Sequence, residues 1–164
     1  MRELSQIDAR TEAPARCQLA SAVQTAASVL QSRYPDYRVE LRVHGSAAVQ
    51  VGLSAGRIGQ ILENAVANAQ SFAPRGSRIA IELTRDKEPA NARIAVTDEG
   101  PGFEEPERVF DRFYSSRADR NGHLGLGLSI VRSIAESAGG TVAALNRRDV
   151  DSGALLEITL PVVS

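Results

Sequence analysis

The chain has 164 residues and is 43% hydrophobic, which is enough to bury the core of a single domain. Its net charge of −1 argues against a broad basic surface for nucleic acid or anionic lipid. Its single cysteine excludes an internal disulfide and a cysteine-rich metal site. No apolar run has the length of a membrane span, and the first residues lack the apolar stretch of a signal peptide, so we expect a soluble chain in the cytoplasm.

The segment before Pro14 differs from the rest of the chain. It is polar, with Met1, Leu4 and Ile7 spaced by three. This spacing fits the tail of a helix that packs within a longer structure, and a frayed terminus is the alternative.

Three elements are predicted before residue 54. Apolar residues recur at threes and fours over residues 18–33, which predicts a helix. Residues 37–43 alternate between apolar and polar, which predicts a half-exposed strand, and residues 48–51 can form a short return strand. His44 continues the polar side of the first strand, so we expect a solvated histidine rather than a catalytic one.

A second helix is predicted to start after Ser54, a candidate N-cap, and to end near residue 72. A polar stripe lies beside its apolar stripe, because Gln60, Asn64 and Asn68 are spaced by four. Asparagine has a low propensity for helix interiors, so two asparagines one turn apart at the edge of the core suggest a shared polar target. A solvated helix face is the alternative.

Asp98 ends the second of two alternating strands, predicted over residues 78–84 and 92–98. It lies on the face that apolar residues occupy, where a carboxylate is costly unless it is hydrogen-bonded. A nearby arginine, backbone amides or an amine of a ligand could satisfy it. Gly100 and Gly102 follow in a predicted tight turn, because glycine adopts backbone angles that other residues avoid.

A second pair of glycines, Gly125 and Gly127, opens a helix predicted over residues 124–138, and two closing strands follow over residues 141–145 and 156–160. The free N–H groups at a helix start favour an anion, and glycine lets a ligand approach the backbone. We therefore interpret the region between the two glycine pairs as a nucleotide pocket. A carboxylate for the base lies at one end, glycine backbone for the phosphates lies at the other, and a flap lies between them.

Four motifs stand in fixed order across about 70 residues. Residues 63–72 resemble the N box of sensor histidine kinases, residues 98–103 their first glycine box, residues 110–114 their F box and residues 125–131 their second glycine box. A lone Gly-x-Gly is weak evidence, whereas four ordered motifs are strong. Over roughly residues 15–163, the chain is similar to the catalytic domain of this family.

The resemblance implies the Bergerat-type ATP-binding fold, which gyrase-type, Hsp90-type and MutL-type ATPases share. It is a two-layer α/β sandwich, in which a mixed sheet of about five strands carries roughly three helices on one face. Residues 1–13 are then the tail of a preceding dimerisation helix or a linker, and residues 14–164 are the catalytic ATP-binding domain.

The resemblance also implies roles for individual residues. The aspartate at Asp98 accepts a hydrogen bond from the adenine amino group, Asn68 holds a Mg²⁺ ion that bridges the phosphates, and Asn64 lies close by. Arg112, in the F box, is a candidate for stabilising developing charge, as are Arg117 and Arg120 in the lid. The catalytic residues expected are Asn64, Asn68 and Arg112. The residues expected to bind the cofactor are Asn68, Ser71, Phe72, Asp98, Gly100, Gly102, Gly125, Leu126, Gly127 and Leu128.

The chain departs from the family pattern at three places. Many relatives carry a lysine or arginine where Ser71 stands, so phosphate binding here is expected to be weaker or to depend on a lid arginine. Many relatives carry Gly-Thr where this chain has His123 and Leu124, and His123 either donates to a phosphate or flanks the lid. The phosphoacceptor motif, a histidine followed by an acidic residue on a dimerisation helix, is missing.

We therefore expect the catalytic domain of a two-component histidine kinase, which transfers the γ-phosphoryl of Mg·ATP to a histidine on a separate dimerisation domain. Its partners would be that domain and a downstream response regulator, with no nucleic acid and no direct membrane contact; an inner-membrane anchor in a full-length protein is left open. One alternative is an anti-sigma-factor-type serine kinase, although the F box speaks against it. A second is a nucleotide-binding regulatory module without catalysis. A gyrase-like ATPase is less favoured, because Asn64 stands where those enzymes place the glutamate that activates water.

Overall fold

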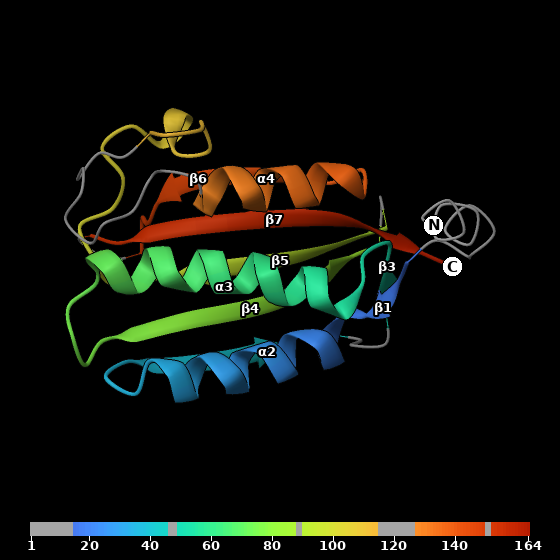
Figure 1. Cartoon of the computed structure of the whole chain (residues 1–164), viewed down its shortest axis with the longest axis horizontal. Coiled ribbons are helices and arrows are strands. Elements are labelled where there is room, and N and C mark those ends of the chain that lie inside the picture. The colour runs from blue at the N-terminus through green and yellow to red at the C-terminus, as the bar shows by residue number, and fades with distance from the viewer. Residues whose placement is uncertain (1–14, 46–48, 88–89, 115–126, 150–151) are drawn as a thin grey trace, which may run out of the picture.

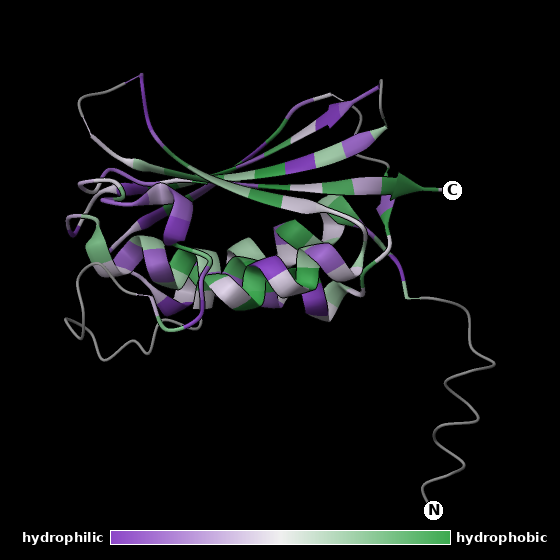
Figure 2. Cartoon of the chain, turned by 90° about the horizontal axis from the view of Figure 1, so that it is seen from above, coloured by the Kyte–Doolittle hydropathy of each residue, from purple (hydrophilic) through white to green (hydrophobic). Residues whose placement is uncertain are grey.

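The computed structural model describes residues 15–45, 49–87, 90–114, 127–149 and 152–164. These residues form two layers, with a twisted sheet on one side and three helices packed against one of its faces (Figures 1 and 2). This arrangement confirms the predicted two-layer α/β sandwich. The predicted segment of residues 1–13 lies outside the described residues. No helix in the described part of the chain combines the length and the apolar character needed to cross a membrane.

The helical layer contains α2 (Leu19–Arg33), α3 (Ala55–Phe72) and α4 (Gly127–Ser137), and a 3-10 turn, η1 (Pro106–Arg108), lies between β5 and α4 in the chain. The helix predicted over residues 18–33 is confirmed as α2. Ser54 caps α3 as predicted, because its hydroxyl accepts a hydrogen bond from the N–H of Arg57 at 3.2 Å.

The sheet is mixed. Its order is β1-β3-β7-β5-β4-β2, with β6 also paired to β7, and β2 and β4 are the parallel pair. Five strands have six or more residues, which matches the predicted number, and two strands of two residues extend the sheet at one side. The strands are β1 (Cys17–Gln18), β2 (Arg38–Val43), β3 (Gln50–Val51), β4 (Arg78–Asp86), β5 (Asn91–Thr97), β6 (Thr141–Asn146) and β7 (Ala154–Val163).

Several element boundaries differ from the prediction. β4 is longer than expected because its pairing with β5 continues to Asp86 opposite Asn91. β7 is also longer, because it pairs with β5, β6 and β3 along its length. The last helix is described only from Gly127 and ends at Ser137, where Gly140 donates its N–H to the carbonyl of Ala135 at 2.8 Å.

The core lies between the two layers. Alternate residues of the central strands point toward the helices and are fully buried, whereas the intervening residues face outward. The largest fully buried side chains on the strands are Val51, Ile79, Ile81, Ile94, Ile158 and Leu160, and those on α2 and α3 are Leu19, Val23, Ile58, Ile61, Leu62 and Val66.

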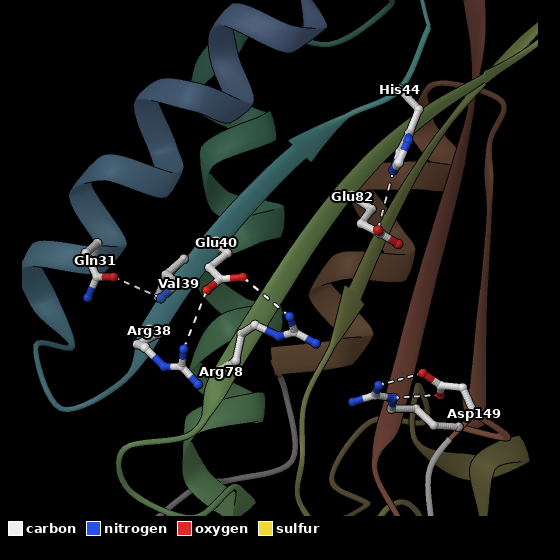
Figure 3. Close-up of polar contacts among 9 residues, drawn as sticks. Gln31, Arg38, Val39, Glu40, His44, Arg78, Glu82 and Asp149 are labelled. Carbon is white, nitrogen blue, oxygen red and sulfur yellow. Dashed lines mark hydrogen bonds and ion pairs between the residues drawn. The ribbon is translucent and has the colours of Figure 1, made fainter.

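The outer face of the sheet, away from the helices, is polar, and the edge strand β2 is protected from pairing with another strand. Glu40 on β2 lies between Arg38, at 3.8 Å, and Arg78 on β4, at 3.6 Å (Figure 3). At the edge of β2, Gln31 of α2 accepts the N–H of Val39 at 2.9 Å and donates to the carbonyl of Tyr37 at 2.7 Å. This side chain therefore occupies backbone groups that would otherwise be open to another strand.

Candidate functional site

The buried carboxylate of Asp98 is the centre of the site. Asp98 directly follows β5, and only 4% of its surface is exposed. Its Oδ1 accepts hydrogen bonds from the N–H of Gly100 at 2.8 Å and from the N–H of Ala154 at 3.4 Å. Backbone amides thus satisfy one oxygen, as the sequence allowed. Within the described residues, no hydrogen bond involves Oδ2.

Burial changes the titration of this group. Loss of solvent raises the pKa of Asp98 above its usual value, because desolvation disfavours the charged form. The N–H groups of Gly100 and Ala154 and the charge of Arg147 act in the opposite direction, and Glu99 adds a smaller upward shift of the pKa. Desolvation is the largest cause, so the site holds a carboxylate that costs free energy to keep ionised.

The turn after Asp98 requires glycine. A Cβ on Gly100 would lie 3.0 Å from the carbonyl oxygen of Phe72 and 3.1 Å from Oδ1 of Asp98. Gly102 has a φ of +86°, and a Cβ there would lie 2.6 Å from Oδ1 of Asn146. Phe72 ends α3, so the C-terminal end of that helix, the turn and the carboxylate lie together.

The hairpin formed by β6 and β7 holds this turn in place, through contacts that no local pattern in the sequence predicts. Asn146 accepts the N–H of Phe103 at 2.6 Å and donates to the carbonyl of Phe103 at 3.1 Å. Arg147 donates from Nη1 to the carbonyl of Asp98 at 3.1 Å. The turn-like composition of residues 146–153 was visible in the sequence, but the partner of that turn was not.

The two asparagines of the N box lie on one side of α3. Asn64 donates from Nδ2 to the carbonyl of Gln60 at 2.9 Å, and its Oδ1 lies 3.2 Å from the position that a Cβ on Gly127 would take. The start of α4 therefore passes close to Asn64. Asn68 is half-buried and has no side-chain hydrogen bond among the described residues.

The C-terminal end of α3 carries two further predicted residues. The hydroxyl of Ser71 donates to the carbonyl of Ala67 at 2.9 Å, within the same helix. Phe72 is half-buried and contributes the carbonyl that faces Gly100. Tyr37 holds this end of the helix, because its hydroxyl oxygen lies 2.9 Å from the carbonyl oxygen of Gln70 and 3.1 Å from that of Ala73, and its one proton can donate to either. The asparagines are thus carried on a helix that is anchored at its end.

The segment between the two glycine boxes is described only in part. Phe110 is buried, Arg112 is exposed with its guanidinium 5.3 Å from the ring centre of Phe113, and Phe113 is 66% exposed. Arg112 has no hydrogen bond or ion pair among the described residues. Gly127 and Leu128 begin α4, and Leu128 is buried. The remaining predicted lid residues lie outside the described residues: Arg117, Arg120, His123, Leu124, Gly125 and Leu126.

The donor set of the site limits which metal it could hold. In the described part of the chain, no group of three histidine, cysteine or acidic side chains is placed to bind a metal ion. The half-buried amide of Asn68 is a neutral oxygen donor, and Mg²⁺ takes one or two protein oxygens when phosphates and water complete its shell. The residues therefore fit a metal that arrives with a phosphorylated ligand and do not fit a cage built from protein groups alone.

Comparison with known proteins gives a consistent result. Residues 54–164 match the family model described as "Histidine kinase-, DNA gyrase B-, and HSP90-like ATPase". The chain is 44% identical over 114 residues to the sensor protein ChvG of Rhizobium meliloti (strain 1021), covering 64% of this chain and 19% of ChvG. It is 38% identical over 107 residues to the sensor-like histidine kinase SenX3 of Mycobacterium tuberculosis (strain ATCC 25618 / H37Rv), covering 62% of this chain and 25% of SenX3.

Solved structures share the fold. The mycobacterial sensor histidine kinase MprB superposes with a TM-score of 0.79 at 25% identity, over 92% of this chain and 98% of that one. Full-length ShkA, solved in complex with AMPPNP, superposes with a TM-score of 0.75 at 24% identity, over 92% of this chain and 31% of that one. The chain spans about a fifth of the length of ChvG and a quarter of that of SenX3.

Proposed function

Because the chain belongs to the histidine kinase-, DNA gyrase B- and HSP90-like ATPase family, we propose that it is the catalytic ATP-binding domain of a two-component sensor histidine kinase. Its curated relatives include the sensor protein ChvG and the sensor-like histidine kinase SenX3, and residues 54–164 of this chain match the ATPase family model. In this proposal the domain transfers the γ-phosphoryl of ATP to a histidine on a separate dimerisation domain. The observation that carries the proposal is the buried carboxylate of Asp98 beside a turn that only glycine fits.

Asp98 is proposed to bind the adenine. Its Oδ1 is already held by two backbone N–H groups, which fixes the orientation of the carboxylate. Oδ2 then remains as the acceptor for the exocyclic amine of the base. A hydrogen bond to an ionised acceptor is stronger than one between neutral groups, and burial removes competition from water. Gly100 and Gly102 keep the backbone open beside this group, because a side chain at either position would meet neighbouring atoms.

Asn68 and Asn64 are proposed to serve the phosphate end. Asn68 would hold Mg²⁺ through its amide oxygen, and the ion would neutralise phosphate charge when bound. Asn64 lies against Gly127 at the start of α4. It is therefore proposed to link the part of α3 that faces the phosphates to the start of α4. Ser71 offers a hydroxyl but no charge. Because it already donates to the carbonyl of Ala67, it is proposed to contribute less than a basic residue would.

The segment from the F box to α4 is proposed to close over the nucleotide. Arg112 is exposed and free of ion pairs among the described residues, so its charge is available to the transferring phosphoryl group. Gly125, Leu126, Gly127 and Leu128 are proposed to shape the phosphate end of the pocket. Phosphoryl transfer needs mainly positioning and charge neutralisation, so no covalent intermediate on this chain is required.

The acceptor is proposed to lie on another domain. His44 is exposed, directly follows β2 and lies 3.4 Å from Glu82 on β4, on the outer face of the sheet (Figure 3). His44 is therefore part of a surface pair on the outer face of the sheet. It does not lie on a helix that could bring it to the nucleotide site on the opposite face. A response regulator downstream and a membrane anchor elsewhere in a longer protein belong to the same proposal.

The test is phosphoryl transfer supplied in trans. The chain is mixed with radiolabelled ATP, Mg²⁺ and a dimerisation domain that carries an acceptor histidine. We expect label on that histidine and none on this chain. Asn68→Ala should lower the rate by about 100-fold. Asn91→Ala, an asparagine on β5 outside the site, should leave the rate within about twofold.

Three results would count against the proposal. Stoichiometric label on His44 or His123 would mean that the chain carries its own acceptor. Transfer to serine of a small protein, with none to histidine, would instead support the serine-kinase alternative. Nucleotide binding without transfer to either acceptor would point to a regulatory module.

A further inference from the structure

Arg147 is a largely buried cationic side chain beside the site, and it does not belong to any of the four motifs. It follows β6 in the turn toward β7, and only 9% of its side chain is exposed. Its Nη1 donates to the carbonyl oxygen of Asp98 at 3.1 Å, across 49 positions of sequence. Charged donors that are largely removed from water form hydrogen bonds that are costly to lose.

A second residue holds the guanidinium in place. Nε of Arg147 donates to Oδ1 of Asp149 at 3.1 Å, and Nη2 donates to Oδ2 at 2.8 Å. This forked pairing fixes the plane of the guanidinium, which a single contact would not do. Asp149 lies at the outer face of the sheet, where its two contacts are drawn (Figure 3). The third donor, Nη1, is thereby aimed at Asp98.

The backbone around this contact is closely fitted. Arg147 donates its N–H to the carbonyl of Gly153 at 2.9 Å, and Asp98 donates its N–H to the carbonyl of Ala154 at 3.1 Å. Ala154 returns its own N–H to Oδ1 of Asp98. A Cβ on Gly153 would lie 2.6 Å from Cδ of Arg147 and would also meet the carbonyl oxygen of Asp98. Asp98 is thus held on its N–H, its carbonyl and its carboxylate by one hairpin.

We infer that Arg147 is a positioning residue for nucleotide recognition, which holds the backbone of Asp98 so that the carboxylate keeps its aim at the base. This inference rests on the proposed function for what the carboxylate binds, but not for the geometry that holds it. Arg147 need not touch the nucleotide. It acts through Asp98, and Asn146 fixes the other end of the same turn through Phe103.

The charge of Arg147 also bears on the protonation of Asp98. The charged groups that act on this carboxylate are Arg147, which lowers its pKa, and Glu99, which raises it. An acceptor for the adenine amine must be ionised to be strong, so nucleotide affinity should fall as the pH falls through the pKa of Asp98. Removing Arg147 raises that pKa and moves the loss of affinity to higher pH.

The test compares neighbouring arginines. Arg147→Gln removes the contact and the charge, whereas Arg148→Gln removes the same charge from an exposed residue without a hydrogen bond or ion pair among the described residues. Arg147→Lys keeps the charge but loses the fork. Calorimetric titration with Mg·ADP should show affinity about tenfold weaker in Arg147→Gln and within about twofold in Arg148→Gln. The deficit of Arg147→Gln should widen as the pH falls through the pKa of Asp98, and Arg147→Lys should restore the wild-type pH dependence.

Two measurements without nucleotide separate this inference from the proposed function. Hydrogen exchange at the N–H of Gly100, which Asp98 holds, should be about tenfold faster in Arg147→Gln than in Arg148→Gln. Carboxyl-resolved NMR titration should give a higher pKa for Asp98 in Arg147→Gln only. If wild type fails to bind ADP while these two signals respond, the proposed function fails, and what stands is that Arg147 positions the backbone and carboxylate of Asp98.

The inference is overturned if the two glutamine variants agree in exchange and in the Asp98 titration, whether or not nucleotide binds. It is also overturned if Arg147→Gln weakens ADP by the same factor at every pH, because that is what a general loss of order would give. Should Arg147→Gln fail to fold, Arg147→Lys and Asp149→Asn provide the comparison. Asp149→Asn leaves Arg147 in the chain but weakens the group that orients it.

Discussion

Two carboxylates on the same sheet have opposite surroundings. Asp98, at the end of β5, is 4% exposed and accepts hydrogen bonds from two backbone N–H groups. Glu40, on the outer face of β2, pairs with Arg38 at 3.8 Å and with Arg78 at 3.6 Å and remains open to solvent (Figure 3). The half-buried Glu40 has two cationic partners, whereas the buried Asp98 accepts its hydrogen bonds from backbone N–H groups.

The difference between these two carboxylates indicates which polar groups are suited to binding a ligand. An ion pair in water gains little, because solvent screens it and both side chains lose freedom. A carboxylate that backbone groups hold in a site without water is costly to ionise, but once ionised it forms a strong hydrogen bond to a ligand. We therefore expect Asp98 to matter greatly for binding and little for folding, and Glu40 to matter little for either.

The largest expected effect is on nucleotide binding by Asp98→Asn. The amide keeps the shape of the carboxylate but loses the charge, so affinity for Mg·ADP should fall by about 100-fold. Isothermal calorimetry measures this directly. Asp86→Asn is the control, because Asp86 is an ion-paired carboxylate on β4 that lies outside the site, 2.7 Å from Arg93. Equal losses in the two variants would contradict the special role of the buried group.

The next effect is on stability, at the hairpin that holds Asp98. Gly153 has a φ of +144°, and a Cβ there would lie 2.6 Å from Cδ of Arg147. Gly153→Ala should lower the free energy of unfolding by about 2–3 kcal/mol, through strain and a clash in a packed turn. Gly45→Ala is the matched control, because Gly45 has a φ of +72° but nothing lies within 4 Å of a Cβ there.

Strain alone predicts a loss of about 1 kcal/mol for Gly45→Ala. Chemical denaturation of both variants gives the difference. If the two losses were the same, the close fit of the hairpin against Asp98 would not contribute to stability.

The same comparison shows what the sequence could and could not reveal. Alternation along β5 placed Asp98 on the buried face, and the side-chain oxygen of Ser54 marked the start of α3, because both signals act between residues that are close in the chain. The four motifs gave the family. These patterns involve residues that are close in the chain, so they can be recognised without knowing the tertiary structure.

The residues that hold the site in place could not be recognised from local patterns. Arg147 meets Asp98 across 49 positions, and Asn146 meets Phe103 across 43. Gln31 covers the edge of β2 in place of a further strand, although periodicity assigned it only to a helix. Such contacts depend on how β6 and β7 pair, and the alternation of one strand does not specify its partner.

A smaller effect is expected in the pH dependence of stability. The folded-state pKa of Asp98 is raised above its unfolded value, so the folded state holds the proton more tightly. Below the pKa of Asp98 in the unfolded state, the carboxyl is protonated in both states, and its ionisation does not lower the free energy of unfolding. As the pH rises from the unfolded value through the folded value, the wild type loses stability that Asp98→Asn keeps.

Asp98→Asn should therefore be at least as stable as wild type near neutral pH, with an advantage of about 1 kcal/mol that shrinks on acidification. Denaturation of both proteins across this range measures the difference, and the titration of all other groups cancels between them. A variant that is less stable than wild type at neutral pH would show that the hydrogen bonds from Gly100 and Ala154 outweigh desolvation.

The smallest effect is expected on the outer face of the sheet. Glu40→Gln removes the charge that faces Arg38 and Arg78 while keeping the length of the side chain. Because all three groups are partly open to solvent, the free energy of unfolding should change by at most about 0.5 kcal/mol, and less at high salt. ADP affinity should stay within about twofold of wild type. A loss of more than about 1 kcal/mol would mean that this ion pair stabilises the fold more than a solvent-screened pair can, and the contrast between the two carboxylates would disappear.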